Sequence, residues 1–101
     1  MNALNFLSNF FIAIENDNRI SITHIAIYAA LLQFKIDKEF THSIEAFSYE
    51  IMQIAKISGS NTYSKCVRQL HEYGYIKYEP TFKNNQRSKI QLINLNNSSQ
   101  L

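Results

Sequence analysis

The sequence contains few residues that break or cross-link a fold. Its 101 residues include 2 Gly, 1 Pro and 1 Cys, so long irregular loops are not expected. A single cysteine, Cys66, excludes an internal disulfide and fits a reducing cytoplasm. No run approaches the roughly 18 apolar residues of a membrane span, and no targeting segment is evident. We therefore expect a cytoplasmic protein that has no membrane partner.

The composition is that of a folded chain with one core. Hydrophobic residues make up 46% of the sequence and charged residues 18%, with 6 Tyr and 7 Phe. Disordered chains lack this supply of aromatic and branched side chains, and a chain of this length has room for hardly more than one core. We expect a single domain over residues 1–96, followed by a flexible tail at 97–101.

Charge is distributed unevenly along the chain. Residues 1–55 carry three Lys or Arg against six Asp or Glu, a formal net charge of −3. Residues 56–101 carry seven against two, a formal net charge of +5. Such a division is typical of a domain that turns one half toward a polyanion, although chance scatter in a short chain gives the same pattern.

Two helices are predicted in the first third of the chain. Residues 4–15 repeat apolar side chains at helical spacing, and the stripe consists of Leu4, Leu7, Phe10, Phe11 and Ile14, with Ile12 pointing away from it. After the turn residues Asn16–Asn18, Ser21 or Thr23 can cap a helix that runs to about Lys35 or Ile36. That helix is apolar nearly all round, which predicts a buried central helix. A very short strand centred on Ile44 follows.

The middle of the chain reads as two helices joined by a tight turn. Ser48 is a plausible N-cap for a short helix, and Gly59 can supply the positive φ that the following turn needs. Ser60 or Asn61 then caps a helix that runs through Tyr73 and ends at Gly74. Two helices joined by a turn of about three or four residues are typical of a helix-turn-helix.

A period of two replaces the helical period after Gly74. Residues 75–79 read as a strand that Pro80 ends, and residues 90–95 read as the returning strand. The polar, basic segment between them forms the tip of a hairpin. The predicted fold is therefore α+β, a winged helix-turn-helix with three core helices, an N-terminal helix and a C-terminal β-hairpin wing.

The stretch from Thr62 to Pro80, TYSKCVRQLHEYGYIKYEP, together with the earlier run Ile25–Leu31, carries a family resemblance. The chain resembles small winged-helix regulators found on plasmids and conjugative transposons of Bacteroides-type bacteria, over roughly residues 4–95. Such relatives have no known catalytic activity. The resemblance implies double-stranded DNA binding in transcription or in maintenance of a mobile element.

The predicted third helix has an apolar and a polar side. Tyr63, Cys66, Val67 and Leu70 share one face. The opposite face is polar and net positive toward its N-terminal end, and it consists of Asn61, Ser64, Lys65, Arg68, Gln69 and Glu72. Such a helix enters the major groove with its first turns leading, where Asn, Lys and Arg read base edges and hydroxyls contact phosphates. An ordinary solvated face would look the same. The candidate DNA-binding residues of this helix are Ser60, Asn61, Thr62, Ser64, Lys65 and Arg68.

The wing offers a second set of contacts. Its basic and amide side chains can follow a phosphate backbone or enter a minor groove, although a solubilising loop has the same composition. The candidate residues of the wing are Lys83, Asn85, Arg87 and Lys89.

Other chemistry finds little support in the sequence. Cys66 falls on the buried face, and His24, His42 and His71 lie at no metal-ligand spacing. We therefore expect no enzyme, no metal and no cofactor. A protein-interaction module, or an accessory factor in plasmid replication or excision, remains an alternative to a transcriptional regulator. A homodimer through the N-terminal helix is also expected, with Phe6 and Ile12 at the contact.

Overall fold

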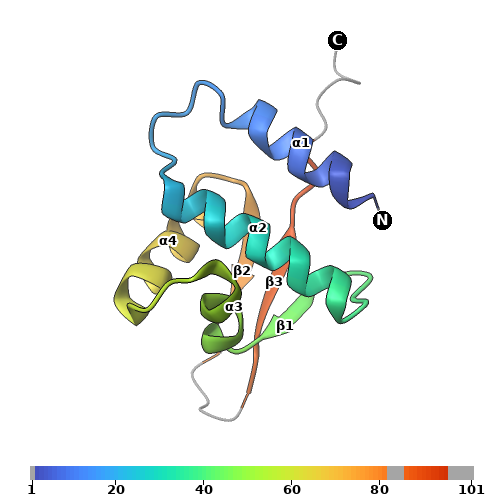
Figure 1. Ribbon diagram of the computed structural model, residues 1–101, viewed down its shortest axis with the longest axis vertical. Helices are drawn as coiled ribbons and strands as arrows, with labels where there is room; N and C mark the ends of the chain where they lie inside the picture. The colour runs from blue at the N-terminus through green and yellow to red at the C-terminus, as the bar shows by residue number, and fades with distance from the viewer. Residues whose placement is uncertain (1, 82–85, 96–101) are drawn as a thin grey trace.

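The computed structural model describes residues 2–81 and 86–95, which form an α+β fold as predicted. The described residues contain four helices and three strands (Figure 1), which are α1 (Ala3–Ala13), α2 (Ile22–Asp37), β1 (Ile44–Ala46), α3 (Ser48–Ala55), α4 (Ser60–Glu72), β2 (Ile76–Glu79) and β3 (Ser88–Leu92). The short strand expected at Ile44 is confirmed. The tail predicted at residues 97–101 lies outside the described residues.

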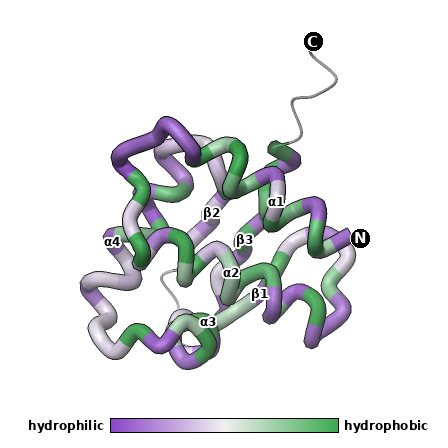
Figure 2. The backbone as a smooth tube through the Cα atoms, turned by 45° about the horizontal axis from the view of Figure 1, so that its top comes forward, coloured by the Kyte–Doolittle hydropathy of each residue, from purple (hydrophilic) through white to green (hydrophobic). Residues whose placement is uncertain are grey.

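Helix α2 is the centre of the fold. Its N-cap is Ser21, one of the two residues expected there, and the Ser21 hydroxyl accepts a hydrogen bond from the His24 N–H. Helices α1, α3 and α4 all pack on α2, and α1 runs back along it in roughly the opposite direction (Figure 1). Hydrophobic residues mark both α1 and α2 in Figure 2, whereas the loop that joins them is hydrophilic.

The two N-terminal helices are less buried than their apolar patterns predict. Phe10 is fully buried and stacks on Tyr28 with 3.9 Å between ring centroids. Leu4 and Phe11 were expected on the same core stripe, but they are 77% and 47% exposed. The reason is that α1 has α2 as its main neighbour, so only a narrow part of its stripe is covered.

The expectation that α2 is buried all round is also wrong. Ile22 is 85% exposed and Ile36 is 43% exposed, and Ala29 between them is exposed as well. These residues share one side of α2, which no element of the described chain covers.

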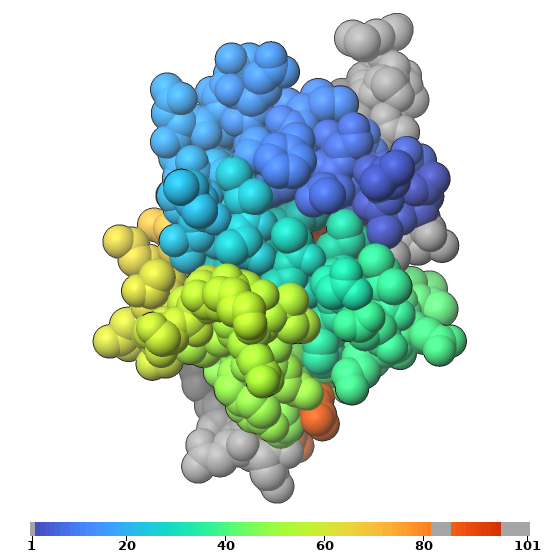
Figure 3. Space-filling model, viewed as in Figure 1, coloured from blue at the N-terminus to red at the C-terminus, as the bar shows by residue number. Residues whose placement is uncertain are grey.

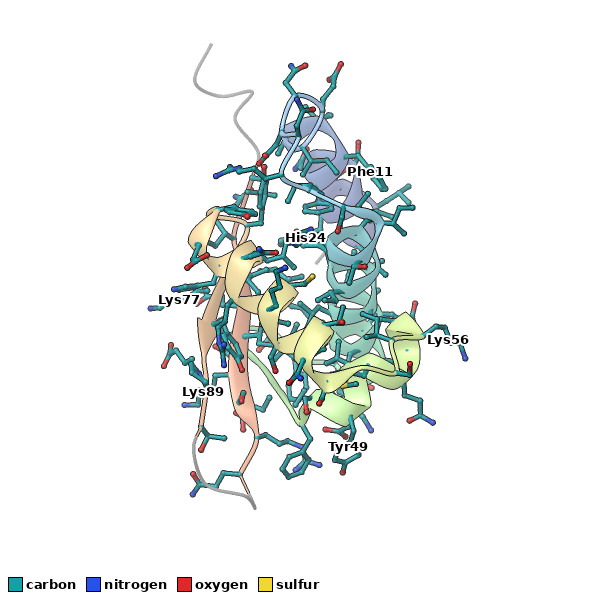
Figure 4. All side chains as sticks on the ribbon, turned by 90° about the vertical axis from the view of Figure 1, so that its left-hand side faces the viewer. Phe11, His24, Tyr49, Lys56, Lys77 and Lys89 are labelled. Atoms are coloured by element: carbon teal, nitrogen blue, oxygen red, sulfur yellow. The ribbon has the colours of Figure 1, made fainter. Side chains whose placement is uncertain are left out.

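The three strands form one antiparallel sheet in the order β1-β3-β2. The register pairs Ile44 with Ile90 and Ile76 with Leu92, so these four side chains face the helices and are buried. The alternate residues face away from the helices, and they include Lys77 and Lys89 (Figure 4). The helices therefore cover one face of the sheet and leave the other open.

The turn between α3 and α4 differs in detail from the prediction. Helix α3 takes Phe47 as its N-cap instead of Ser48. The left-handed residue is Lys56, with φ of 64°, and its N–H caps the end of α3 by bonding to the Met52 carbonyl. Gly59 has φ of −92° and serves as the N-cap of α4, a role expected of Ser60 or Asn61. Gly74 ends α4 with φ of 91°, as predicted.

Candidate nucleic-acid interface

Helix α4 is anchored by the four apolar residues that its sequence predicts. Tyr63, Cys66, Val67 and Leu70 are all buried, with Tyr73 half-buried beyond them. Burial raises the pKa of the Cys66 thiol, although the charge of Lys65 opposes this. The thiol therefore belongs to the core, as expected. This anchoring fixes which side of α4 faces outward.

The outer side of α4 brings the predicted base-reading residues together. Asn61, Lys65 and Arg68 are exposed, and their spacing of four and three residues places them on one face. Within residues 2–81 and 86–95, neither Lys65 nor Arg68 has an ion-pair or hydrogen-bond partner. Of the predicted hydroxyl residues, Ser60 and Thr62 are exposed and Ser64 is half-buried. The Lys65 and Arg68 side chains are therefore available to a ligand without the loss of an ion pair or hydrogen bond to the described residues.

Gln69 was placed on this outer face, and that placement is wrong. Its amide oxygen accepts a hydrogen bond of 2.8 Å from Nε2 of His24, which is buried in α2. The other ring nitrogen, Nδ1, accepts the Ser21 N–H at 2.9 Å, so the proton sits on Nε2. The imidazole thus caps α2 and holds α4 at the same time. Nothing in the local pattern predicts this pair, because its members are 45 residues apart.

A second connection joins the end of α4 to the loop between α1 and α2. Asp17 accepts two hydrogen bonds of 2.8 Å from the Arg19 guanidinium and one from the hydroxyl of Tyr75, which follows α4. The Arg19 guanidinium also lies 4.0 Å from the ring centroid of Tyr73. The bonds from Arg19 and then from Tyr75 hold the pKa of the Asp17 carboxyl well below its usual range. The C-terminal end of α4 is therefore fixed to the loop between α1 and α2.

Arg87, which the sequence predicts to contact the DNA phosphate backbone, is instead bound to other residues of the protein. Its Nε donates to Oε1 of Glu50 at 3.2 Å, and its guanidinium lies 4.5 Å from the Phe47 ring centroid. Glu50 also accepts the Phe47 N–H at 2.9 Å. Partial burial alone would raise the pKa of Glu50, but the bonds from Phe47 and Arg87 outweigh it and lower the pKa. Arg87 thus ties the segment before β3 to the start of α3.

The other three predicted wing residues divide into two groups. Lys89 is exposed on the open face of the sheet, where the register places it between Glu45 and Glu79. Two neighbouring carboxylates weaken its attraction for a phosphate. Lys83 and Asn85 lie outside the described residues. The basic surface that the structure describes is therefore centred on α4, which faces the viewer in Figure 4, while Lys77 and Lys89 project to one side.

The part of the chain that the structure describes contains neither a cluster of metal ligands nor a membrane-spanning helix. No three His, Cys, Asp or Glu side chains there come together as the ligands of a metal ion would. No helix there has the length and apolar character needed to cross a membrane.

Comparison of the chain with models of protein families, with curated proteins and with solved structures found no match.

Proposed function

We propose that this protein is a winged helix-turn-helix domain that binds double-stranded DNA. In this proposal α3, the turn at Lys56 and α4 form the helix-turn-helix, and the hairpin of β2 and β3 forms the wing. Helix α4 lies in the major groove, while the segment before β3 follows the backbone. The role is regulation of transcription from a plasmid or mobile element, in line with the resemblance of the sequence to such regulators.

One observation carries the proposal. Asn61, Lys65 and Arg68 lie exposed along one side of α4, from its first turn to its third, while the opposite side of the helix is buried. Asn reads adenine and Lys or Arg reads guanine in the major groove, each good contact being worth about 1–3 kcal/mol. A helix with its inner side buried and its C-terminal end held by Gln69 against His24 and by Tyr75 against Asp17 presents these groups in a fixed orientation.

The test begins with selection of a preferred duplex from a randomised DNA pool, followed by titration of that duplex across a salt series. We expect the double variant Lys65→Ala/Arg68→Ala to bind at least about tenfold more weakly. Both side chains are exposed, so its circular dichroism and stability should match the wild type.

A matched control lowers the net charge by the same two units outside α4 and the wing, at the exposed residues Asn5 and Lys38. Asn5→Asp/Lys38→Ala should bind the selected duplex nearly as well as the wild type at physiological salt. If both double variants lose the same affinity, binding reflects net charge alone and the assignment of α4 is wrong. If the wild type enriches no sequence and binds no duplex, the proposed function itself is wrong.

A further inference from the structure

Helices α1 and α2 leave an apolar surface uncovered on one side of the molecule. Along α2 the residues Ile22, Ala29 and Ile36 are exposed, and along α1 so are Leu4 and Phe11. Between the two helices lies a groove of about 250 Å³, lined mainly by Leu4, Leu7, Ala29, Leu32 and Ile36. We call this surface the α1–α2 face. Figure 3 views the side of the molecule on which the two helices lie next to each other.

The α1–α2 face carries almost no charge, apart from Asp37 at its edge, which accepts a hydrogen bond of 2.8 Å from Gln33 in the groove. Residues 1–14 and 20–34, which supply nearly all of it, contain no Asp, Glu, Lys or Arg. The exposed polar residues interspersed there are Asn, Ser and Gln. Exposed helix surfaces of a monomer normally carry charges, and a contiguous apolar patch marks an interaction site.

We propose that a second copy of this chain covers the α1–α2 face in a two-fold symmetric dimer. In such a contact a surface meets its own copy, so any charge that it carries near the axis opposes the same charge. A face whose charge is confined to Asp37 at its edge keeps this repulsion away from the axis. Partners of other composition are selected through complementary charges, and the rest of this face has none to offer. Its chemistry therefore fits self-association.

The sequence predicted a dimer through Phe6 and Ile12, and the structure changes the residues concerned. Phe6 is half-buried against the core, with the Lys35 ammonium 5.6 Å from its ring centroid. Ile12 is exposed, but helical spacing places it away from the groove, on the outer side of α1. The proposed dimer instead uses the edge of α1 together with the bare side of α2.

The α1–α2 face and the outer side of α4 point in different directions. In Figure 4 α4 faces the viewer, whereas Phe11 projects from α1 to the right. Both surfaces are therefore usable at once. The dimer goes beyond the proposed DNA binding and does not depend on it, because its mass can be measured without DNA.

The experiment measures mass by sedimentation at about 10–100 µM protein, a range in which a dimer of ordinary affinity is populated. The wild type should give about twice the monomer mass of 11.8 kDa. The variant Leu4→Glu/Ile36→Glu, with one charge on each side of the groove, should weaken dimerisation at least tenfold and sediment as a monomer. Circular dichroism establishes that it is folded. Should it unfold, Leu4→Glu alone is used, since Leu4 is largely exposed.

A matched control places two glutamates at exposed apolar positions of α3, in Tyr49→Glu/Ile54→Glu. Tyr49 lies at the end of the molecule opposite Phe11 in Figure 4, so this variant should remain dimeric. A monomeric wild type at about 100 µM, a dimer that resists the groove variants, or mass that grows without limit would each overturn the proposal.

Discussion

Replacing Glu50 by Gln is expected to strengthen DNA binding, because Glu50 holds Arg87 inside the protein. Arg87 donates to Glu50 and stacks on Phe47 beside the segment that we propose follows the DNA backbone. In Glu50→Gln the amide oxygen can still accept the Phe47 N–H, so the start of α3 keeps its hydrogen bond. The substitution therefore removes the charge that retains Arg87 and leaves the helix intact.

The magnitude follows from the exposure of the pair. The Arg87 side chain is 47% exposed and that of Glu50 is 19% exposed. Solvent screens a pair of this kind, and exposed pairs contribute about 0.2–1 kcal/mol. A release of about 0.5–1 kcal/mol corresponds to roughly two- to fivefold tighter binding. One additional phosphate contact would also steepen the slope of log K against log salt by about 0.9.

Fluorescence anisotropy with a labelled duplex at several salt concentrations measures both quantities. Glu15→Gln is the control, since it removes the same charge from the α1–α2 loop, far along the chain from Arg87. Arg87→Gln should weaken DNA binding. In a protein that already carries Arg87→Gln, adding Glu50→Gln should not change the affinity for DNA through Arg87. If Glu50→Gln binds DNA more weakly than the wild type, the pair orients the segment for binding, and the idea that Glu50 withholds Arg87 from DNA is refuted.

Three further predictions concern stability. Tyr28→Phe should stabilise the protein by about 1 kcal/mol and raise the Tm by about 4–8 °C. The reason is that the buried Tyr28 hydroxyl has no hydrogen-bond partner among the described residues. A lower Tm in calorimetry would show that the hydroxyl is hydrogen-bonded. Gly74→Ala should destabilise by about 1–2 kcal/mol in urea titrations. Its φ is 91°, and apart from the two adjoining residues no described residue has an atom within 4 Å of the added Cβ, which leaves backbone strain as the cost. An unchanged midpoint would contradict this. The folded-state pKa of Asp17 is lowered by Arg19 and Tyr75, so its stabilisation is complete above the unfolded pKa of about 3.9 and is lost as the pH falls. Urea titrations at pH 7 and pH 3 should therefore show a larger acid-induced loss for the wild type than for Asp17→Asn, and equal losses would disprove the role of the carboxylate.

The features that the sequence predicts well depend on neighbouring residues. The Ser21 cap, the end of α4 at Gly74 and the buried side of α4 each follow from residue types within one or two turns. Hydrogen bonding at a helix end and the period of a helix are local properties, so they can be read without knowledge of the fold.

The errors arise where the outcome depends on distant neighbours. Leu4 and Phe11 have the correct spacing for a core stripe, but burial requires a second element above them. Gln69 pairs with His24 and Arg87 pairs with Glu50 across 45 and 37 residues respectively. At the α3–α4 turn the backbone takes its left-handed residue at Lys56, although Gly59 is the residue type that adopts it most easily.

The residues that attach α4 to the fold are different from the residues that it exposes for binding. In many binding proteins these two requirements, stability and recognition, compete. The attachment of α4 uses the buried face and Gln69, whereas Asn61, Lys65 and Arg68 lie exposed on the other side of the helix. Changes at these three positions should therefore cost little free energy of folding. A library randomised there would retain a folded scaffold in most of its members. Under the proposed DNA-binding function, recognition of new sequences can then be selected without compensating substitutions elsewhere.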